Sequence, residues 1–160
     1  MKSVQVLISL LVLTGLSIPA SAELQADMRR LLDTKRCQQC DLSEADLSEA
    51  ELTGADLLGA NLQKTILRGA KLKGADLSSA NLIEADLTGA DLRDAKLHST
   101  TLRKANLSAA NLTWADLYRA FLEEAIFNDA NLENANLNDA KLDGTNFCGA
   151  TMPDGTKGPC

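Results

Sequence analysis

A five-residue repeat runs through most of this 160-residue chain and limits the folds that it can adopt. From Cys40 onward, a small residue is followed in most repeats by Asp or Asn, then by Leu, then by two variable residues. The central apolar residue recurs without insertion from Leu42 to Met152, which makes 23 repeats. The small residue is Ala, except at Cys40 and at three threonines: Thr65, Thr100 and Thr145.

Neither an α-helix nor a flat strand can bury a residue that recurs every five positions. The leucines would spread around a helix of about 3.6 residues per turn and would alternate between the two faces of a strand. All the central leucines can be buried if the chain turns once per repeat. The small residue and Leu then both point inward from a short extended side. Stacked coils of such sides pair their backbones about 4.8 Å apart. Because aromatic residues make up only 3% of the chain, many small units must build the core, and we predict an all-β solenoid.

The units at 45–49 (Ala-Asp-Leu-Ser-Glu) and 105–109 (Ala-Asn-Leu-Ser-Ala) resemble those of the pentapeptide-repeat family. The resemblance covers residues 40–152 and implies a right-handed quadrilateral β-helix, in which four repeats form one coil and residues 20 apart stack. Charges that recur at this spacing alternate in sign and would form external ladders. One column is Glu44, Lys64, Glu84, Lys104 and Glu124, and a shorter one is Glu51, Lys71 and Asp91.

Residues 1–22 differ from the repeats and are typical of a cleavable export signal. Lys2 precedes an apolar run, and the triplet at 20–22 (Ala-Ser-Ala) has the small-residue form that signal peptidase cleaves, which predicts a mature chain that begins at Glu23. An uncleaved membrane anchor is the alternative, but the run is shorter than the roughly 20 residues that a bilayer span needs. Exported family members with an N-terminal helix and a CxxC pair are typical of cyanobacteria, which implies the periplasm or the thylakoid lumen.

An open solenoid exposes apolar groups and strand edges at both ends, so we expect each end to be covered. Residues 23–36 carry apolar side chains at helical spacing and are predicted to form an amphipathic capping helix before the β-helix at 37–152. Residues 153–160 are predicted to form an irregular tail, because Pro and Gly interrupt the repeat there.

Four cysteines in an exported chain allow three disulfide pairings. In the solenoid Cys37 and Cys40 lie at the start and Cys148 and Cys160 at the end, and about five coils at ~4.8 Å separate the two pairs by more than ~20 Å. This separation exceeds the reach of a disulfide. We therefore predict a Cys148–Cys160 bridge, which would hold the tail, and a Cys37–Cys40 bridge. A buried thiol at Cys40 is the alternative for the second pair.

The spacing of Cys37 and Cys40 also occurs in redox proteins, so a thiol–disulfide protein is one alternative function. A thioredoxin-like site, however, needs a βαβ unit and a helix that begins at the first cysteine, whereas this pair follows the predicted helix. A single CxxC supplies two metal ligands, and His98, the single histidine, lies far along the solenoid. We predict no catalytic, cofactor-binding or metal-binding residues, and hence no enzyme.

Four large apolar residues occupy outward positions within one coil: Trp114, Tyr118, Phe121 and Ile126. Such residues on a polar exterior are typical of contacts with a protein partner or a second copy, so we predict a partner-binding patch. Scattered surface residues are the alternative, because the four do not share one side of the coil.

The leading functional hypothesis is a non-enzymatic structural or protein-binding scaffold with an unknown protein partner. Without Lys2 the chain has fifteen basic and twenty-two acidic residues, a balance that argues against nucleic-acid binding. We expect no membrane contact after signal cleavage. The alternative from another class is an acidic rod that imitates duplex DNA, as in family members that bind DNA gyrase. The export signal opposes this alternative, as do four basic residues that interrupt the acidic surface: Lys71, Lys73, Arg93 and Lys96.

Overall fold

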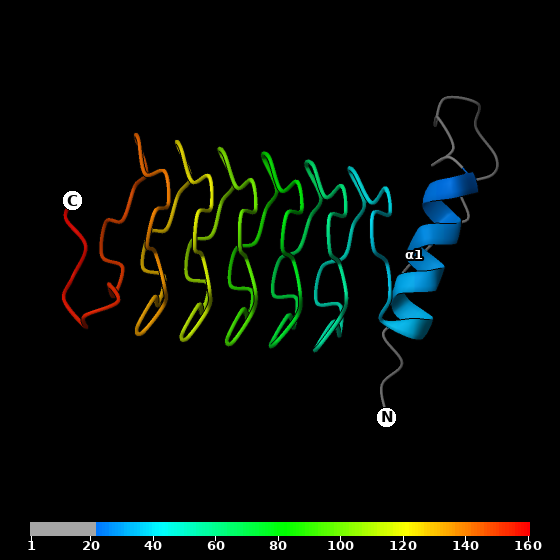
Figure 1. Cartoon of the computed structure of the whole chain (residues 1–160), viewed down its shortest axis with the longest axis horizontal. Coiled ribbons are helices and arrows are strands. Elements are labelled where there is room, and N and C mark those ends of the chain that lie inside the picture. Colours follow the sequence, from blue (N-terminus) through cyan, green and yellow to red (C-terminus); the bar gives the residue numbers. More distant parts are fainter. Residues whose placement is uncertain (1–21) are drawn as a thin grey trace.

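The computed structural model describes residues 22–160, which form one helix and a long solenoid (Figure 1). The helix, α1, spans Ala22–Thr34 and lies across one end of the solenoid, while the C-terminus lies at the other end. Isolated β-bridges rather than extended strands join the sides of successive coils. The predicted export signal lies almost wholly outside the described residues and stays a prediction. Within residues 22–160 no helix is long and apolar enough to cross a bilayer.

The coils stack in a register of 20 residues, as the resemblance implies. Parallel bridges join each outward residue before a central Leu to its counterpart one coil further on, beginning with Arg36 and Asp56. Hydrogen bonds run in both directions between coils. The N–H of Leu47 donates to the carbonyl of Ile66 at 2.8 Å, and the N–H of Ile66 donates to the carbonyl of Ala45 at 2.9 Å. Four repeats of five residues therefore complete one coil with four sides.

Each repeat ends in a tight turn, and one residue of that turn has an uncommon backbone conformation. The N–H of Ala45 donates back to the carbonyl of Leu42 at 3.1 Å, and Glu44, the second variable residue, has a φ of 59°. This left-handed conformation suits Gly and penalises β-branched residues. From residue 39 to residue 149 this position never holds Val, Ile or Thr. The two variable positions of the repeat are therefore not equivalent, a difference that the predicted repeat pattern did not include.

Inward-pointing leucines and alanines form a narrow continuous core. The central residues at 42–132 are at most 1% exposed. Thr65 and Thr100 replace Ala at inward positions, and each hydroxyl donates to the carbonyl of a central Leu of an earlier coil at 2.7 Å, so that these buried polar groups are satisfied. The Phe127 and Phe147 rings stack with centroids 5.2 Å apart. The two wider rings therefore lie one above the other, at the same inward position of adjacent coils.

Helix α1 covers the first coil with its apolar face. Leu31 is fully buried, and three further apolar residues pack partly buried against the core: Leu24, Met28 and Leu32. The helical spacing of the apolar residues predicted a helix that runs to Arg36, but α1 ends at Thr34. The helix ends there because Lys35 takes a φ of 59° and its N–H donates to the carbonyl of Leu31 at 2.8 Å. Arg36 already belongs to the solenoid.

Residues 153–160 leave the repeat and turn back over part of the last coil. The N–H of Gly158 donates to the carbonyl of Ala150 at 2.8 Å. Gly158 approaches Phe147 so closely that a Cβ at this position would lie 2.1 Å from the Phe147 carbonyl oxygen. A residue with a side chain at 158 would therefore force the tail away from the coil.

Candidate functional site

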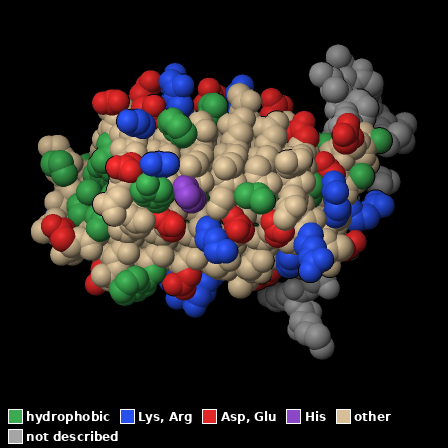
Figure 2. Space-filling view, in the orientation of Figure 1, with side chains coloured by type: hydrophobic (Ala, Val, Ile, Leu, Met, Phe, Trp, Pro, Cys, Tyr) green, Lys and Arg blue, Asp and Glu red, His purple; other side chains and the backbone are tan. Residues whose placement is uncertain are grey.

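The Tyr118 cluster, which consists of His98, Tyr118 and Arg119, lies on the outer surface of the solenoid. The His98 ring meets the Tyr118 ring edge to face, with centroids 5.0 Å apart. The Arg119 guanidinium carbon lies 4.9 Å from the Tyr118 ring centroid, in cation–π geometry, and Arg119 also pairs with Asp139 at 3.7 Å. Figure 2 shows the single histidine among apolar and charged side chains on this face. His98 of the preceding coil and Arg119 of the same coil thus hold Tyr118 in place, and Arg119 is itself tied to the following coil through Asp139.

The four residues of the predicted partner-binding patch point outward from different sides of the coil. Trp114 is the most exposed at 63%, Phe121 is 40% and Ile126 is 36% exposed, and Tyr118 is half-buried. Trp114 lies in the turn that leads into the side of Tyr118, whereas Phe121 and Ile126 lie on the next two sides. The four therefore do not share one face. Trp114 and Tyr118 are the pair that flanks a single side, and their role in binding stays a prediction.

Outward Asp and Asn residues before the central Leu hold the turns through short hydrogen bonds. Asp46 accepts the hydroxyl and the backbone N–H of Ser48 at 2.6 and 3.0 Å, and these bonds lower the pKa of the Asp46 carboxyl. Asp41 accepts the same two groups of Ser43, with the same direction of pKa shift. Because these donors favour the ionised form, the carboxylates act as turn acceptors at neutral pH.

Two ion pairs lie in the column that begins at Glu44. Lys64 pairs with Glu84 at 3.9 Å, and Lys104 pairs with Glu124 at 3.7 Å. All four side chains are about half exposed, with relative areas between 46% and 61%. The predicted ladder is therefore present only in part, because no ion pair within residues 22–160 joins Glu44 to Lys64 or Glu84 to Lys104. The exposure of the side chains makes each pair a weak contributor to stability.

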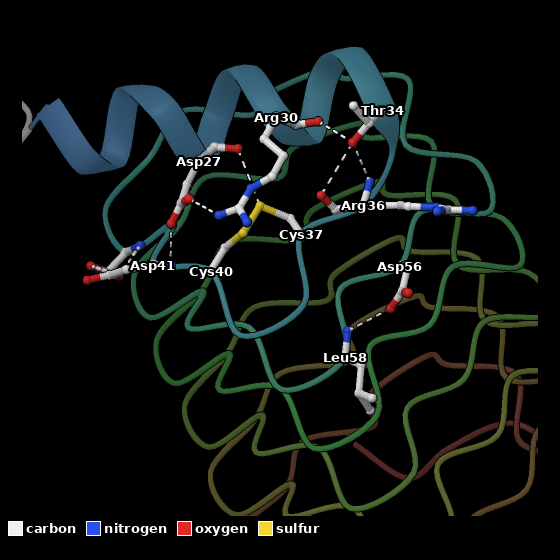
Figure 3. The surroundings of a disulfide bond; sticks show 10 residues. Asp27, Arg30, Thr34, Arg36, Cys37, Cys40, Asp41, Asp56 and Leu58 are labelled. Carbon is white, nitrogen blue, oxygen red and sulfur yellow. Dashed lines mark hydrogen bonds and ion pairs between the residues drawn. A yellow bond between two sulfur atoms is a disulfide. The ribbon is translucent and has the colours of Figure 1, made fainter.

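A second cluster lies beneath α1 and joins the helix to the first coil (Figure 3). Cys37 and Cys40 form a disulfide and are 1% and 3% exposed. Asp27 of α1 is 7% exposed, and its carboxylate accepts the N–H of Asp41 at 3.0 Å and pairs with Arg30. A carboxylate oxygen of Asp27 and both sulfur atoms lie within 4.8 Å of one another. In residues 22–160 this is the one group of three such side chains that could share a metal ion.

Both predicted disulfides are present, the second between Cys148 and Cys160. Asp27 was not among the predicted site residues, although one signal in the sequence points to it. Asp27 lies directly before Met28 and three residues after Leu24, on the apolar face of the helix. An acidic residue on such a face needs a polar partner in the folded protein.

A family model described as pentapeptide repeats matches the solenoid in eight copies, over residues 36–69, 70–108, 105–142 and 115–153. The chain belongs to the pentapeptide repeat family. Members of this family are right-handed quadrilateral β-helices, and the 20-residue coil described above has that four-sided form. Pentapeptide repeat proteins are in general non-enzymatic structural or binding proteins. Among curated proteins none matches this chain.

Two solved pentapeptide repeat proteins from the cyanobacterium Nostoc are similar to this one. HetL, involved in regulation of heterocyst differentiation, is 38% identical with a TM-score of 0.58, and the match covers 77% of this chain and 62% of HetL. This chain therefore spans less than two thirds of the length of HetL. The protein alr5209 is 44% identical with a TM-score of 0.51, and the match covers 54% of this chain and 69% of alr5209.

Proposed function

We propose that this pentapeptide repeat protein is an exported, non-enzymatic scaffold that binds another protein through the surface around Trp114 and Tyr118. The proposal depends on two aromatic side chains that flank the same side of one coil, of which Tyr118 is held in place and Trp114 is exposed. Tyr118 is held between His98 and Arg119, and Trp114 is 63% exposed. Aromatic and Arg side chains supply most of the binding energy at protein interfaces. A side chain that is already ordered also loses less conformational entropy on binding.

The solenoid supports this proposal because it fixes the position of the surface. Each side of a coil is hydrogen-bonded to the coil before it and the coil after it, as at Leu97, whose N–H donates to the carbonyl of Asp116 at 2.7 Å. The side that carries Tyr118 lies four coils beyond the side that follows α1, as the bridges from Arg36 to Asp116 show, so the surface does not depend on how the first coil is closed. A partner would therefore meet a preformed surface.

The proposed compartment is the periplasm or the thylakoid lumen. Two disulfides in one chain are typical of oxidising compartments, and the sequence at residues 1–22 is typical of an export signal. The test is cell fractionation followed by N-terminal sequencing of the recovered protein. We expect a mature chain that begins at Glu23 in the exported fraction. A chain that keeps Met1 and stays in the cytosol would contradict the proposed compartment.

The binding role is tested by crosslinking and affinity capture from that compartment with the mature chain. We expect Trp114→Ala and Tyr118→Ala each to reduce recovery of the same partner by about tenfold or more, as at binding hot spots. Leu58→Ala is the matched control, because Leu58 is 40% exposed in the same column as Tyr118. Equal recovery with all three variants would refute this surface as the binding site.

A further inference from the structure

We propose that reduction of the Cys37–Cys40 disulfide creates a zinc site, with the two thiolates and the Asp27 carboxylate as ligands. This inference is independent of the partner-binding surface. The three side chains are buried, and their ligand atoms lie within 4.8 Å of one another. In a tetrahedral zinc site, metal–ligand bonds of about 2.0–2.3 Å place ligand atoms about 3.5 Å apart. Small side-chain movements therefore suffice to bring the three atoms around one ion.

The two cysteines have the spacing and the orientation that a shared ion needs. Two residues separate Cys37 from Cys40, which is the spacing of one half of many structural zinc sites. Their Cα atoms lie 5.3 Å apart, and both sulfur atoms point under α1 toward Asp27 (Figure 3). Once the S–S bond is broken, both thiolates still face the same space.

Asp27 supplies the third ligand that the sequence analysis did not find. Its position is fixed, because one carboxylate oxygen accepts the N–H of Asp41 at 3.0 Å. A hydrogen bond of this kind orients a metal-binding carboxylate. The other oxygen pairs with Arg30, whose side chain is 53% exposed and can turn toward solvent. Two thiolates, one carboxylate and Zn²⁺ carry a net charge of minus one, which the nearby Arg30 balances.

The chemical step conserves atoms and charge. An external dithiol transfers two electrons and two protons to the Cys37–Cys40 disulfide and becomes a disulfide itself. Zn²⁺ then displaces the two thiol protons to solvent, and a water molecule completes four-coordination. The disulfide and the metal compete for the same sulfur atoms, so only the reduced protein binds zinc. Because the cysteines are at most 3% exposed, α1 must open locally before the dithiol reacts.

The test uses the two disulfides of the chain as a matched pair. The Cys148→Ser/Cys160→Ser variant keeps the Cys37–Cys40 pair beside Asp27. The Cys37→Ser/Cys40→Ser variant keeps the other pair, for which no third ligand lies close within residues 22–160. Each variant is reduced with a phosphine and titrated with Co²⁺ as a spectroscopic probe, then with Zn²⁺ in competition. We expect a thiolate-to-cobalt charge-transfer band at one Co²⁺ per chain in the first variant, and its loss on addition of Zn²⁺.

The carboxylate is tested by Asp27→Asn in the Cys148→Ser/Cys160→Ser background. Asn can still accept the Asp41 N–H but is a poor zinc ligand, so we expect Co²⁺ affinity to fall by about tenfold or more, while circular dichroism shows that the fold is kept. Three results would each overturn the proposal. These are no cobalt band in the reduced first variant, an equal band in the Cys37→Ser/Cys40→Ser variant, or unchanged affinity after Asp27→Asn.

Discussion

The two ends of the solenoid are closed to different extents. At the first coil α1 lies across the core, and Leu42 and Leu47 are at most 1% exposed (Figure 1). At the last coil the tail reaches Phe147, which is 9% exposed, but leaves Leu142 40% exposed. The repeat is the same at both ends, so the difference depends on the segment that follows or precedes it. A helix with an apolar face covers a whole coil, whereas eight irregular residues cover part of one.

The backbone edges of the two end coils are each satisfied only in part. At the first coil Asp27 accepts the N–H of Asp41 at 3.0 Å, and the Thr34 hydroxyl accepts the N–H of Arg36 at 3.2 Å. On the same edge the N–H groups of Asp46 and Glu51 have no hydrogen-bond partner among residues 22–160. At the last coil the N–H of Met152 donates to the carbonyl of Thr156 at 2.8 Å, and the N–H of Leu142 has no partner among those residues. Helix α1 therefore supplies polar atoms as well as apolar cover. The remaining groups of both edges are left to solvent or to an added strand.

The largest expected effect compares one substitution at the two ends. Leu42→Ala removes a fully buried side chain and should lower the free energy of unfolding by about 2–5 kcal/mol. Leu142→Ala should cost less than half as much, because that side chain is already 40% exposed. Urea unfolding followed by circular dichroism measures both. Equal losses would mean that the last coil is covered in solution.

The second comparison removes one disulfide at a time. Cys148→Ser/Cys160→Ser opens a loop with a sequence separation of 12, whereas Cys37→Ser/Cys40→Ser opens one with a separation of 3. Loop-closure entropy predicts losses of about 3 and about 2 kcal/mol, respectively. Amide exchange should show the first change at the tail and the second at α1. If the short loop proves the more costly to open, contacts of α1 rather than chain entropy determine the result.

Most of the architecture could be predicted from the sequence because each repeat contains the residues that specify its own turn and its own buried positions. Leucines at every fifth position specify the turns, and the alternation of Lys64 and Glu84 agrees with the 20-residue coil that the bridges establish. The cysteine pairs followed from their places along the solenoid. Leu142 has the same neighbours in sequence as a buried Leu, so its exposure follows only from the path of the tail. The role of Asp27 likewise depends on residues more than ten positions away.

The third comparison is pH dependence at the two ends. Hydrogen bonds from the Ser48 hydroxyl and N–H lower the folded-state pKa of Asp46, and those from Thr156 lower that of Asp154. The folded state therefore binds fewer protons than the unfolded state near pH 3.8, the ordinary pKa of an aspartate, and stability rises with pH there. The contribution is complete above that value and is lost as pH falls through the lower folded-state pKa.

We expect Asp46→Asn to weaken the fall in urea midpoint between neutral and acidic pH, because Asn keeps the turn acceptor without titrating. Asp154→Asn should alter acid-dependent amide exchange in the tail alone. Glu49→Gln, in the same coil as Asp46, is the control for the loss of one charge. An unchanged pH profile for Asp46→Asn would show that its turn hydrogen bonds also persist in the unfolded chain.

The smallest expected effect concerns the external ion pairs, one nearer each end. Lys64→Ala removes the pair with Glu84 and Lys104→Ala the pair with Glu124, and each should cost about 0.2–1 kcal/mol, since all these side chains are about half exposed. Both losses should vanish in about 1 M salt, where the Debye length is about 3 Å. Both pairs join complete coils, so the two variants should agree within error. A much larger loss at Lys64 would mean that surface charge, as well as the cover provided by α1, makes the first coils the more stable end.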